Sequence, residues 1–253
     1  KEGLAYKKES LVNWCPQCNT VLANEQVHEG KCWRHTDTNV EQKRLDQWYF
    51  RIKNYAEQLL SDLDKLSGWP KRVKIMQKNW IGKSQGVDIH FKLEQTDKIL
   101  PTFTTRCDTI YSVTFLVIAP EHPLVDELIL DTPYEQNAKK VIEQIKSQTE
   151  IERTTPQGKD KLGAFTGKYA INPVNKEKIP IYIANFVLMY GTGIVMADAH
   201  DQRDFEFARK YDIPLKFVIS DDGQEINPEK ASRAFTGDGI LYNSAEFSGM
   251  HNR

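Results

Sequence analysis

The spacing of hydrophobic residues in the second half of the chain predicts a mixed α/β domain. Val87, Ile89, Phe91 and Leu93 alternate with polar residues, which is typical of a half-buried β-strand. Other apolar runs predict strands at residues 99–104, 113–118, 167–171, 178–183, 193–197 and 215–219, and helical spacing predicts helices at 122–130, 133–148 and 201–211. Because strands and helices do not alternate regularly, we expect a mixed sheet or an open β-barrel with peripheral helices.

The first half of the chain shows a different pattern. Residues 11–35 carry cysteines and turn residues, and from residue 45 apolar positions recur at steps of three and four. This spacing predicts a long connecting helix with a wide apolar stripe, which we expect to pack on a neighbour. Its end is predicted by Gly68 and Pro70. The apolar positions are Leu45, Trp48, Ile52, Tyr55, Leu59, Leu63 and Leu66.

These changes of pattern predict three parts: a small cysteine-bearing module over residues 1–40, a helical connector over 41–83 and the mixed α/β domain over 84–253. The length of 253 residues allows one large domain or two smaller ones. The chain begins with Lys1 and lacks a signal-like apolar segment, which favours an excised segment of a longer protein.

Composition narrows the classes of partner. Hydrophobic residues make up 40% and charged residues 27%, which is ordinary for a soluble globular protein and unlike a disordered one. The net charge of −1 provides no global field for nucleic acid, so any RNA contact needs a local basic cluster such as Lys71, Arg72, Lys74, Lys78 and Lys83. No apolar run approaches the ~18 residues of a membrane span, so no membrane partner is expected.

Four residues have the spacing of metal ligands. Cys15 and Cys18 form one Cys-x-x-Cys pair, and Cys32 with His35 forms a second pair after a short loop. Tetrahedral zinc accepts three thiolates and one imidazole, so we expect a structural zinc ion in a zinc-ribbon-like module. The alternative is a degenerate knuckle without metal. This spacing also favours a reducing, cytoplasmic location over a disulfide framework.

A threonine-rich turn is the first candidate for binding chemistry. Thr104, Thr105 and Thr109 carry hydroxyls that both donate and accept hydrogen bonds. Their β-branched side chains are stiff, so a turn built from them holds these groups in fixed positions. The alternative is a strand end followed by a helix, with Asp108 or Thr109 as the N-cap.

A pair of carboxylates about a hundred residues later is the second candidate. Asp201 and Asp204 are three residues apart, so on a helix both project on one side near its N-terminus. Asp201 suits the N-cap position, which leaves Asp204 free to bind a cation such as an α-ammonium group. Alternatively, Asp204 pairs with Arg203, Arg106 or Lys210 on a solvated face.

His200, next to this pair, is either a general base or a structurally hydrogen-bonded histidine, and the second is slightly favoured. Gly191-Thr192-Gly193 would let the backbone approach a ligand closely. A thiol hydrolase that uses Cys107 and His200 is a third possibility, disfavoured because no third orienting group is evident.

Several blocks of the chain resemble the editing domain, connective peptide 1, of bacterial-type leucyl-tRNA synthetase. One is Ala-Pro-Glu-His-Pro-Leu-Val at residues 119–125, and others lie at 14–27, 32–34, 47–48, 55–56, 69–70, 76–84 and 169–175. The isoleucyl and valyl enzymes share the editing fold, but the blocks at 14–27 and 76–84 look like the leucyl enzyme specifically.

The resemblance implies an open, barrel-like editing core that hydrolyses the ester of mischarged tRNA(Leu), such as isoleucyl- or norvalyl-tRNA, while excluding leucine. It implies that Asp204 anchors the substrate's α-ammonium group and that Thr109 excludes leucine sterically. The implied catalytic residues are Thr104, Thr105 and Asp204, and the implied substrate-binding residues are Arg106, Thr109, Tyr190, Met196, His200 and Asp201. The implied partners are the acceptor end of tRNA(Leu) and the other domains of a parent class I synthetase.

Two positions depart from the family pattern. Cys107 stands where the family usually has proline, and the stretch at residues 197–199 is one residue shorter and carries Asp198. The aminoacylation signatures of the family are absent, so this chain should not charge tRNA. The rival interpretation is a non-catalytic zinc-ribbon RNA-binding module, and the near-neutral charge and lack of an aromatic, basic surface argue against it.

Overall fold

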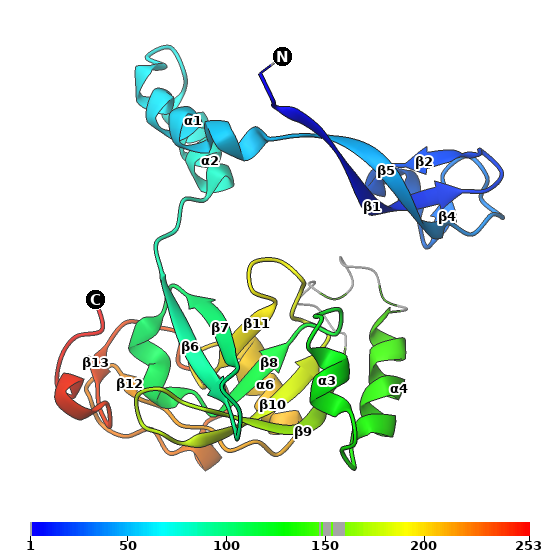
Figure 1. Ribbon diagram of the computed structural model, residues 1–253. Helices are drawn as coiled ribbons and strands as arrows, with labels where there is room; N and C mark the ends of the chain where they lie inside the picture. Colours follow the sequence, from blue (N-terminus) through cyan, green and yellow to red (C-terminus); the bar gives the residue numbers. More distant parts are fainter. Residues whose placement is uncertain (1, 147, 149–152, 154–159) are drawn as a thin grey trace. The chain divides into compact units, whose positions relative to one another are not determined.

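The computed structural model describes residues 2–146, 148, 153 and 160–253 (Figure 1). The chain forms two compact units, Lys1–Lys83 and Ser84–Arg253. Among the described residues, no helix is both long and apolar enough to cross a membrane.

A long antiparallel ribbon dominates the first unit. Strand β1 (Ala5–Cys15) pairs along its length with β5 (Glu41–Phe50), and β2 (Thr20–Leu22) pairs with the end of β1. The short strands β3 (Val27–His28) and β4 (Lys31–Cys32) form a second hairpin. The ribbon brings Cys15, at the end of β1, into a small buried cluster with Cys32 and Leu22.

The predicted helix over residues 45–66 is wrong in its first half. Exposure alternates along β5, with Leu45, Gln47 and Tyr49 partly buried and their neighbours exposed. Tyr49 stacks on its cross-strand partner Tyr6 with ring centroids 5.7 Å apart. Pairing with β1, a strand distant in the sequence, overrides the local helical spacing.

A 3₁₀ turn at Asn24–Gln26 lies between the strands of the first unit, and its other helical segments follow the ribbon. These are the 3₁₀ turn at Ile52–Tyr55, α1 (Ala56–Asp62), the 3₁₀ turn at Leu63–Lys65 and α2 (Lys71–Ile81). Gly68 and Pro70 separate the two helices, as predicted for the end of the first one. The helix α2 is not among the predicted elements. Residues 41–83 therefore contain the strand β5 and two short helices, and not one long helix.

A six-stranded mixed sheet forms the second unit. Its order is β11-β8-β10-β9-β6-β7, and only β8 and β10 are parallel neighbours. The strands are β6 (Val87–Leu93), β7 (Ile99–Thr104), β8 (Phe115–Ile118), β9 (Gly163–Ile171), β10 (Lys178–Ala184) and β11 (Ile194–Ala197). The edge strands β7 and β11 approach each other, but no ladder joins them among the described residues, so the sheet does not close.

Two hydrophobic cores lie on opposite faces of this sheet. In β8, Leu116 and Ile118 belong to one core, and Phe115 and Val117 belong to the other. This double burial explains why β8 is a continuous apolar run. Helices α3 (Val125–Ile129) and α4 (Glu135–Lys146) cover the first core near β9, and α6 (Gln202–Lys210) covers the second (Figure 1).

Most predicted elements of this unit are present, with shifted ends; β6 and β7 have the predicted bounds. Ser147, inside the predicted helix at 133–148, lies outside the described residues. The predicted strand at 215–219 is mostly wrong, because only Ile219 belongs to β12 (Ile219–Ser220), which pairs with β13 (Ile240–Leu241). In the segment before β12, backbone groups bond to side chains where strand pairing was expected. Val218 N donates to His200 Nε2, and Ser112 Oγ donates to the Lys216 carbonyl.

An aromatic cluster attaches α6 to the sheet. The Phe207 ring lies 5.7 Å from Phe115, 5.7 Å from Tyr182 and 4.4 Å from Tyr211, measured between centroids, and Phe207 is fully buried. We predict that Phe207→Ala lowers the free energy of unfolding by about 3–5 kcal/mol, because it removes a large buried ring. Chemical denaturation measures this, with the exposed Phe247→Ala as a control expected to change it by about 1 kcal/mol or less. Equal effects of the two variants would contradict the assignment.

Candidate functional site

The end of β7 and the 3₁₀ helix η4 (Cys107–Ser112) form the threonine turn. Arg106 N donates to Thr104 Oγ1 over 2.9 Å, and Thr109 Oγ1 donates to the Arg106 carbonyl over 2.9 Å. Thr109 is buried, with 1% of its surface exposed, whereas Thr105 is exposed. The N-cap prediction for Asp108 or Thr109 is wrong, since Arg106 holds that position and no side chain caps it.

An ion pair fixes the orientation of Arg106. Its guanidinium binds both carboxylate oxygens of Asp108 at 2.9–3.1 Å, and Asn252 Nδ2 donates to the same carboxylate over 2.9 Å. Burial raises the pKa of Asp108, but these hydrogen bonds outweigh it and hold the pKa below its ordinary value. The turn is thus tied to the last residues of the chain.

Asp201 is the N-cap of α6, as predicted. Its side chain accepts hydrogen bonds from the backbone N–H groups of Arg203 and Asp204, and Arg203 Nη2 lies 3.2 Å from Asp201 Oδ2. Burial raises the pKa of Asp201, but the Arg203 contacts outweigh it and the pKa falls below its ordinary value. This carboxylate is therefore ionised and already has its partners.

Asp204 has a contrasting environment one turn later. Only 5% of its surface is exposed, and its carboxylate accepts one long hydrogen bond, from Asp198 N at 3.4 Å. Burial raises its pKa well above the ordinary value, and the charges of Asp201 and Asp198 act in the same direction.

The cations considered as partners of Asp204 bind other carboxylates. Arg106 pairs with Asp108, Arg203 with Asp201, and Lys210 with Asp160. Within the described part of the chain, no ion pair includes Asp204. The alternative in which Asp204 simply pairs on a solvated face is therefore wrong.

Asp198 lies between the threonine turn and α6. Its carboxyl accepts from His200 N over 2.6 Å, and the Thr109 side chain is close enough to act to lower its pKa, against the larger effect of burial. Its backbone N–H is the donor to Asp204. Asp198 thus lies near both Thr109 and Asp204, which are 95 positions apart in the sequence. Asp198 is not among the predicted site residues, although an acid inside the apolar run at residues 194–199 is the sequence feature that could have indicated it.

Both ring nitrogens of His200 are occupied. Nδ1 lies 2.8 Å from the Phe235 carbonyl, and Nε2 accepts from Val218 N over 3.1 Å. Since the carbonyl only accepts, Nδ1 carries the hydrogen and the ring is neutral. Burial also lowers the pKa of His200. This geometry favours a structural histidine and gives no support to a thiol hydrolase built on Cys107 and His200.

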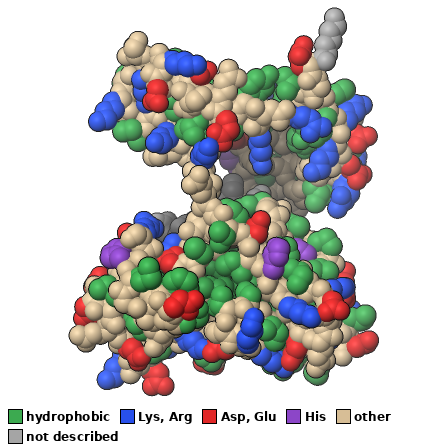
Figure 2. All heavy atoms as spheres, turned by 60° about the vertical axis from the view of Figure 1, so that its left-hand side comes forward, with side chains coloured by type: hydrophobic (Ala, Val, Ile, Leu, Met, Phe, Trp, Pro, Cys, Tyr) green, Lys and Arg blue, Asp and Glu red, His purple; other side chains and the backbone are tan. Residues whose placement is uncertain are grey.

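Tyr190 and Met196 lie in different environments. Tyr190 is 78% exposed, and its phenol is near enough to Arg203 to interact electrostatically, so it lies by the start of α6. Met196 is buried in the core that also contains Ile110 of the threonine turn. Figure 2 shows hydrophobic side chains gathered on one face of the unit. Exposed apolar residues on the edge strands include Phe103 of β7 and Val195 of β11.

The predicted metal ligands of the first unit converge. The ligand atoms of Cys15, Cys18, Cys32 and His35 all lie within 4.8 Å of one another. The sulfurs of Cys18 and Cys32 are 3.7 Å apart, and zinc–sulfur bonds of about 2.3 Å would place two ligands of a tetrahedron about 3.8 Å apart. Cys18 N donates to Cys15 Sγ over 3.3 Å, and the N–H groups of Arg34 and His35 donate to Cys32. The cluster can therefore hold a metal ion.

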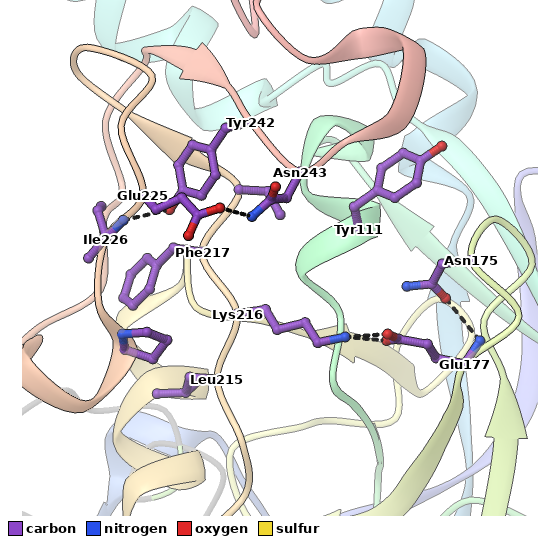
Figure 3. A pocket seen from close by; sticks show the side chains of 12 residues that line it. Tyr111, Asn175, Glu177, Leu215, Lys216, Phe217, Glu225, Ile226, Tyr242 and Asn243 are labelled. Carbon is purple, nitrogen blue, oxygen red and sulfur yellow. Dashed lines mark hydrogen bonds and ion pairs between the residues drawn. The ribbon is translucent and has the colours of Figure 1, made fainter.

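A groove of about 420 Å³ lies in the second unit (Figure 3). It contains none of the predicted site residues. Lys216 forms an ion pair with Glu177, and Asn243 Nδ2 donates a hydrogen bond to Glu225 over 2.7 Å. It is lined by Tyr111, Asn175, Glu177, Leu215, Lys216, Phe217, Val218, Glu225, Ile226, Pro228, Tyr242 and Asn243. The ion pair between Lys216 and Glu177 occupies part of this groove.

Comparison with known families identifies the chain. The model of the leucyl-tRNA synthetase editing domain matches residues 78–253. The chain belongs to this editing-domain family. Residues 1–90 match the model of the class I tRNA synthetases for isoleucine, leucine, methionine and valine. The threonine turn, Asp198 and Asp204 all lie in the part that matches the editing domain.

Relatives and one solved structure agree with this family. Leucine–tRNA ligase of Petrotoga mobilis is 57% identical over 100% of this chain, and that of Thermotoga petrophila is 54% identical over 98%. The chain spans about 30% of the length of either relative. The crystal structure of a ternary complex of Agrobacterium radiobacter K84 LeuRS with tRNA and LeuAMS matches 86% of this chain and 26% of its own, with 39% identity and a TM-score of 0.67.

The buried carboxyl of Asp204 should make the stability of the editing domain depend on pH. Its pKa is raised in the folded state, so the folded protein binds more protons than the unfolded one between about pH 4 and that raised pKa. Asp204 therefore stabilises the fold least at high pH. We predict that Asp204→Asn reduces the loss of stability with rising pH, by up to about 1.4 kcal/mol per pH unit, as measured by denaturation between pH 4 and 9.

Asp201→Asn is the matched control, because the pKa of Asp201 is lowered. The ionised Asp201 stabilises the folded state above its ordinary pKa, and this stabilisation is lost as pH falls. Asp201→Asn should therefore lower the free energy of unfolding at neutral pH, whereas Asp204→Asn should not. The same pH profile for Asp204→Asn and the parent chain would show that Asp204 is ionised in the free protein.

Proposed function

We propose that residues 84–253 are a post-transfer editing site that hydrolyses the ester of mischarged tRNA(Leu), such as isoleucyl- or norvalyl-tRNA, and spares leucyl-tRNA. Membership of the editing-domain family supports this function. The observation that carries it is the buried Asp204 carboxyl, which lacks an ion-pair partner among the described residues and lies near Asp198, as Thr109 does.

The substrate supplies the missing partner of Asp204. Every aminoacyl ester carries a free α-ammonium group, and an opposite charge within ~4–6 Å favours the ionised carboxylate. Binding would therefore ionise Asp204 and hold the amino end of the substrate. An unpartnered buried carboxyl has no use in an RNA-binding surface, and this favours the hydrolase over the non-catalytic zinc-ribbon RNA-binding module.

Thr109 is the steric gate. A pocket that only accommodates aliphatic side chains gains about 1–3 kcal/mol per methylene, too little to separate leucine from its neighbours. Exclusion by shape is more selective. The buried Thr109, held against the Arg106 carbonyl, would clash with the γ-branch of leucine and admit other aliphatic side chains. Met196, Tyr190, His200 and Asp201 would line or support this pocket.

Thr104 and Thr105 would hold the ester and its attacking water. Their hydroxyls can donate toward an oxygen on which negative charge develops, and Arg106 lies beside them to meet the terminal adenosine of the tRNA. An aminoacyl ester is already reactive, so positioning replaces a protein nucleophile; proximity alone supplies up to about 7–11 kcal/mol in ideal cases.

The remaining parts suit a domain of a larger enzyme. We propose that the open sheet is the barrel-like core of the editing fold, that residues 41–83 connect it to the rest of a class I synthetase, and that residues 1–40 are a zinc-ribbon-like module. The relatives are full synthetases of which the chain spans about 30%, which supports this placement. The acceptor end of tRNA(Leu) is then the partner.

The metal is proposed to be structural zinc. Three thiolates and one imidazole suit tetrahedral zinc, and four protein ligands leave no open position for catalysis. We predict one zinc ion per purified chain by metal analysis, with loss of the ion and unfolding of the module in Cys32→Ser. Cys107→Ser is the control and should retain zinc, because Cys107 is exposed and outside the cluster. Absence of stoichiometric metal in the parent chain would contradict the proposal.

Removing the gate should change which substrate is hydrolysed. We predict that Thr109→Ala deacylates Leu-tRNA(Leu) at least about tenfold faster than the parent, because one lost steric contact is worth about 1–3 kcal/mol. Deacylation of Ile-tRNA(Leu) should persist. Both rates are measured with aminoacyl-tRNA labelled on the amino acid.

Asp204→Ala is the companion variant for this assay. This variant lacks the carboxylate that would bind the α-ammonium group of the substrate, so it should hydrolyse neither Leu-tRNA(Leu) nor Ile-tRNA(Leu). Continued sparing of leucine by Thr109→Ala would refute the gate, and near-parental turnover of Ile-tRNA(Leu) by Asp204→Ala would refute the anchor.

A further inference from the structure

We propose that Arg153 is a positioning residue that, together with Glu121, holds the loop at residues 185–193 and thereby the wall of the editing pocket at Tyr190. The loop joins β10 to β11. This inference rests on the proposed editing function, in which Tyr190 lines the pocket. Arg153 is not among the predicted site residues, and its role follows from its contacts.

The loop passes the end of β8. In the sheet β8 lies between β10 and β11, parallel to β10 and antiparallel to β11. The loop therefore leaves β10 and enters β11 at the end of the sheet where β8 finishes, beside the turn at residues 119–122. A hydrogen bond from His122 N to the Ala119 carbonyl over 3.0 Å closes this turn. Contacts with the turn can thus fix the loop.

The C-terminal end of the loop is held by the backbone of this turn. Ala119 N donates to the Gly193 carbonyl over 2.9 Å, and Gly193 N donates to the Tyr190 carbonyl over 3.2 Å. Gly193 has a φ of 66°, and a Cβ added there would lie 2.7 Å from Met189 Sδ and 3.0 Å from His122 Cδ2. The end of the loop is therefore packed against the turn.

The N-terminal end of the loop is held by the Arg153 guanidinium. Nε donates to the Asn185 carbonyl over 2.7 Å, and Nη2 donates to the Val187 carbonyl over 2.7 Å. Nη1 donates to Glu121 Oε1 over 2.5 Å, and only 7% of the Arg153 side chain is exposed. Because Glu121 belongs to the turn after β8, Arg153 ties the start of the loop to the element that holds its end.

These contacts require the shape of a guanidinium. Its planar, rigid fork lets Nε and Nη2 reach two loop carbonyls while Nη1 faces a carboxylate. A lysine ammonium is a compact point charge on a flexible stem, so it could keep the Glu121 ion pair but not the same pair of carbonyl contacts. Arg153→Lys should therefore loosen the loop without removing the charge.

Tyr190 lies between the two held ends of the loop. Its side chain is 78% exposed, so its position depends on the backbone on either side more than on its own packing. A wall that meets the substrate equally before and during the reaction contributes to binding and not to the chemical step. Loosening the loop should therefore raise the KM of editing and leave kcat unchanged.

Amide hydrogen exchange of the full chain, without tRNA, is the first test. We expect Arg153→Lys to raise the exchange rate of the Gly193 amide about threefold to tenfold, as for the loss of one hydrogen bond. Arg209→Lys is the matched control, because Arg209 also donates to two loop carbonyls, those of Pro228 and Ala231. It should leave the exchange of Gly193 at the parental rate.

Deacylation of Ile-tRNA(Leu) is the second test. Arg153→Lys should raise KM about threefold to tenfold at parental kcat, and Arg209→Lys should change neither. Glu121→Gln keeps an oxygen that can accept from Arg153, so it should raise KM less than Arg153→Lys does. Tyr190→Ala should also raise KM, and adding Arg153→Lys to it should have little further effect, because both changes act through one side chain.

The outcomes separate the two proposals. Parental exchange of Gly193 in Arg153→Lys would show that Arg153 does not hold the loop. Faster exchange with parental KM, a fall in kcat, or additive effects of Arg153→Lys and Tyr190→Ala would overturn the positioning role while leaving editing intact. If the parent hydrolysed no aminoacyl-tRNA, the proposed function would fail, and the exchange measurement would still decide whether Arg153 holds the loop.

Discussion

A carboxyl group kept from water without an ion-pair partner is the constraint on which the site depends. Burying an isolated charge is so unfavourable that the group shifts its pKa and becomes neutral unless a partner arrives. Among the described residues Asp204 is in this condition, while Asp201, the N-cap of the same helix, accepts two backbone hydrogen bonds, pairs with Arg203 and is ionised. The same helix end thus carries one carboxylate that is paired and one carboxyl without an ion pair among the described residues.

The fold maintains this arrangement from two directions. The aromatic cluster around Phe207 holds α6 against the sheet, and the approach of the edge strands β7 and β11 brings the threonine turn beside Asp198. The Arg106–Asp108 pair and Asn252 fix the turn from its other side. Each functional group is held by elements far apart in sequence, so the site exists only when the whole domain is folded.

Local patterns predicted much of this domain because its strands and helices bury one or two faces with regular periods. The N-cap role of Asp201 and the convergence of Cys15, Cys18, Cys32 and His35 also followed from spacing alone. The helix over residues 45–66 failed because its first positions, Leu45 and Trp48, lie in β5, where pairing with β1 leaves Leu45 partly buried and Trp48 exposed. The isolation of Asp204 and the position of Asp198 depend on long-range contacts and burial, which no local pattern encodes.

We expect Asp204 to be largely neutral in the free domain and to ionise when it binds an α-ammonium group. Carbon-detected NMR of the Asp204 carboxyl, titrated with pH alone and with a non-hydrolysable amide analogue of norvalyl-adenosine, tests it most directly. The account predicts a raised pKa in the free chain that falls on binding, with release of a proton to the buffer. A carboxyl that titrates at the ordinary value of about 4 in both states, with no proton released, would contradict it.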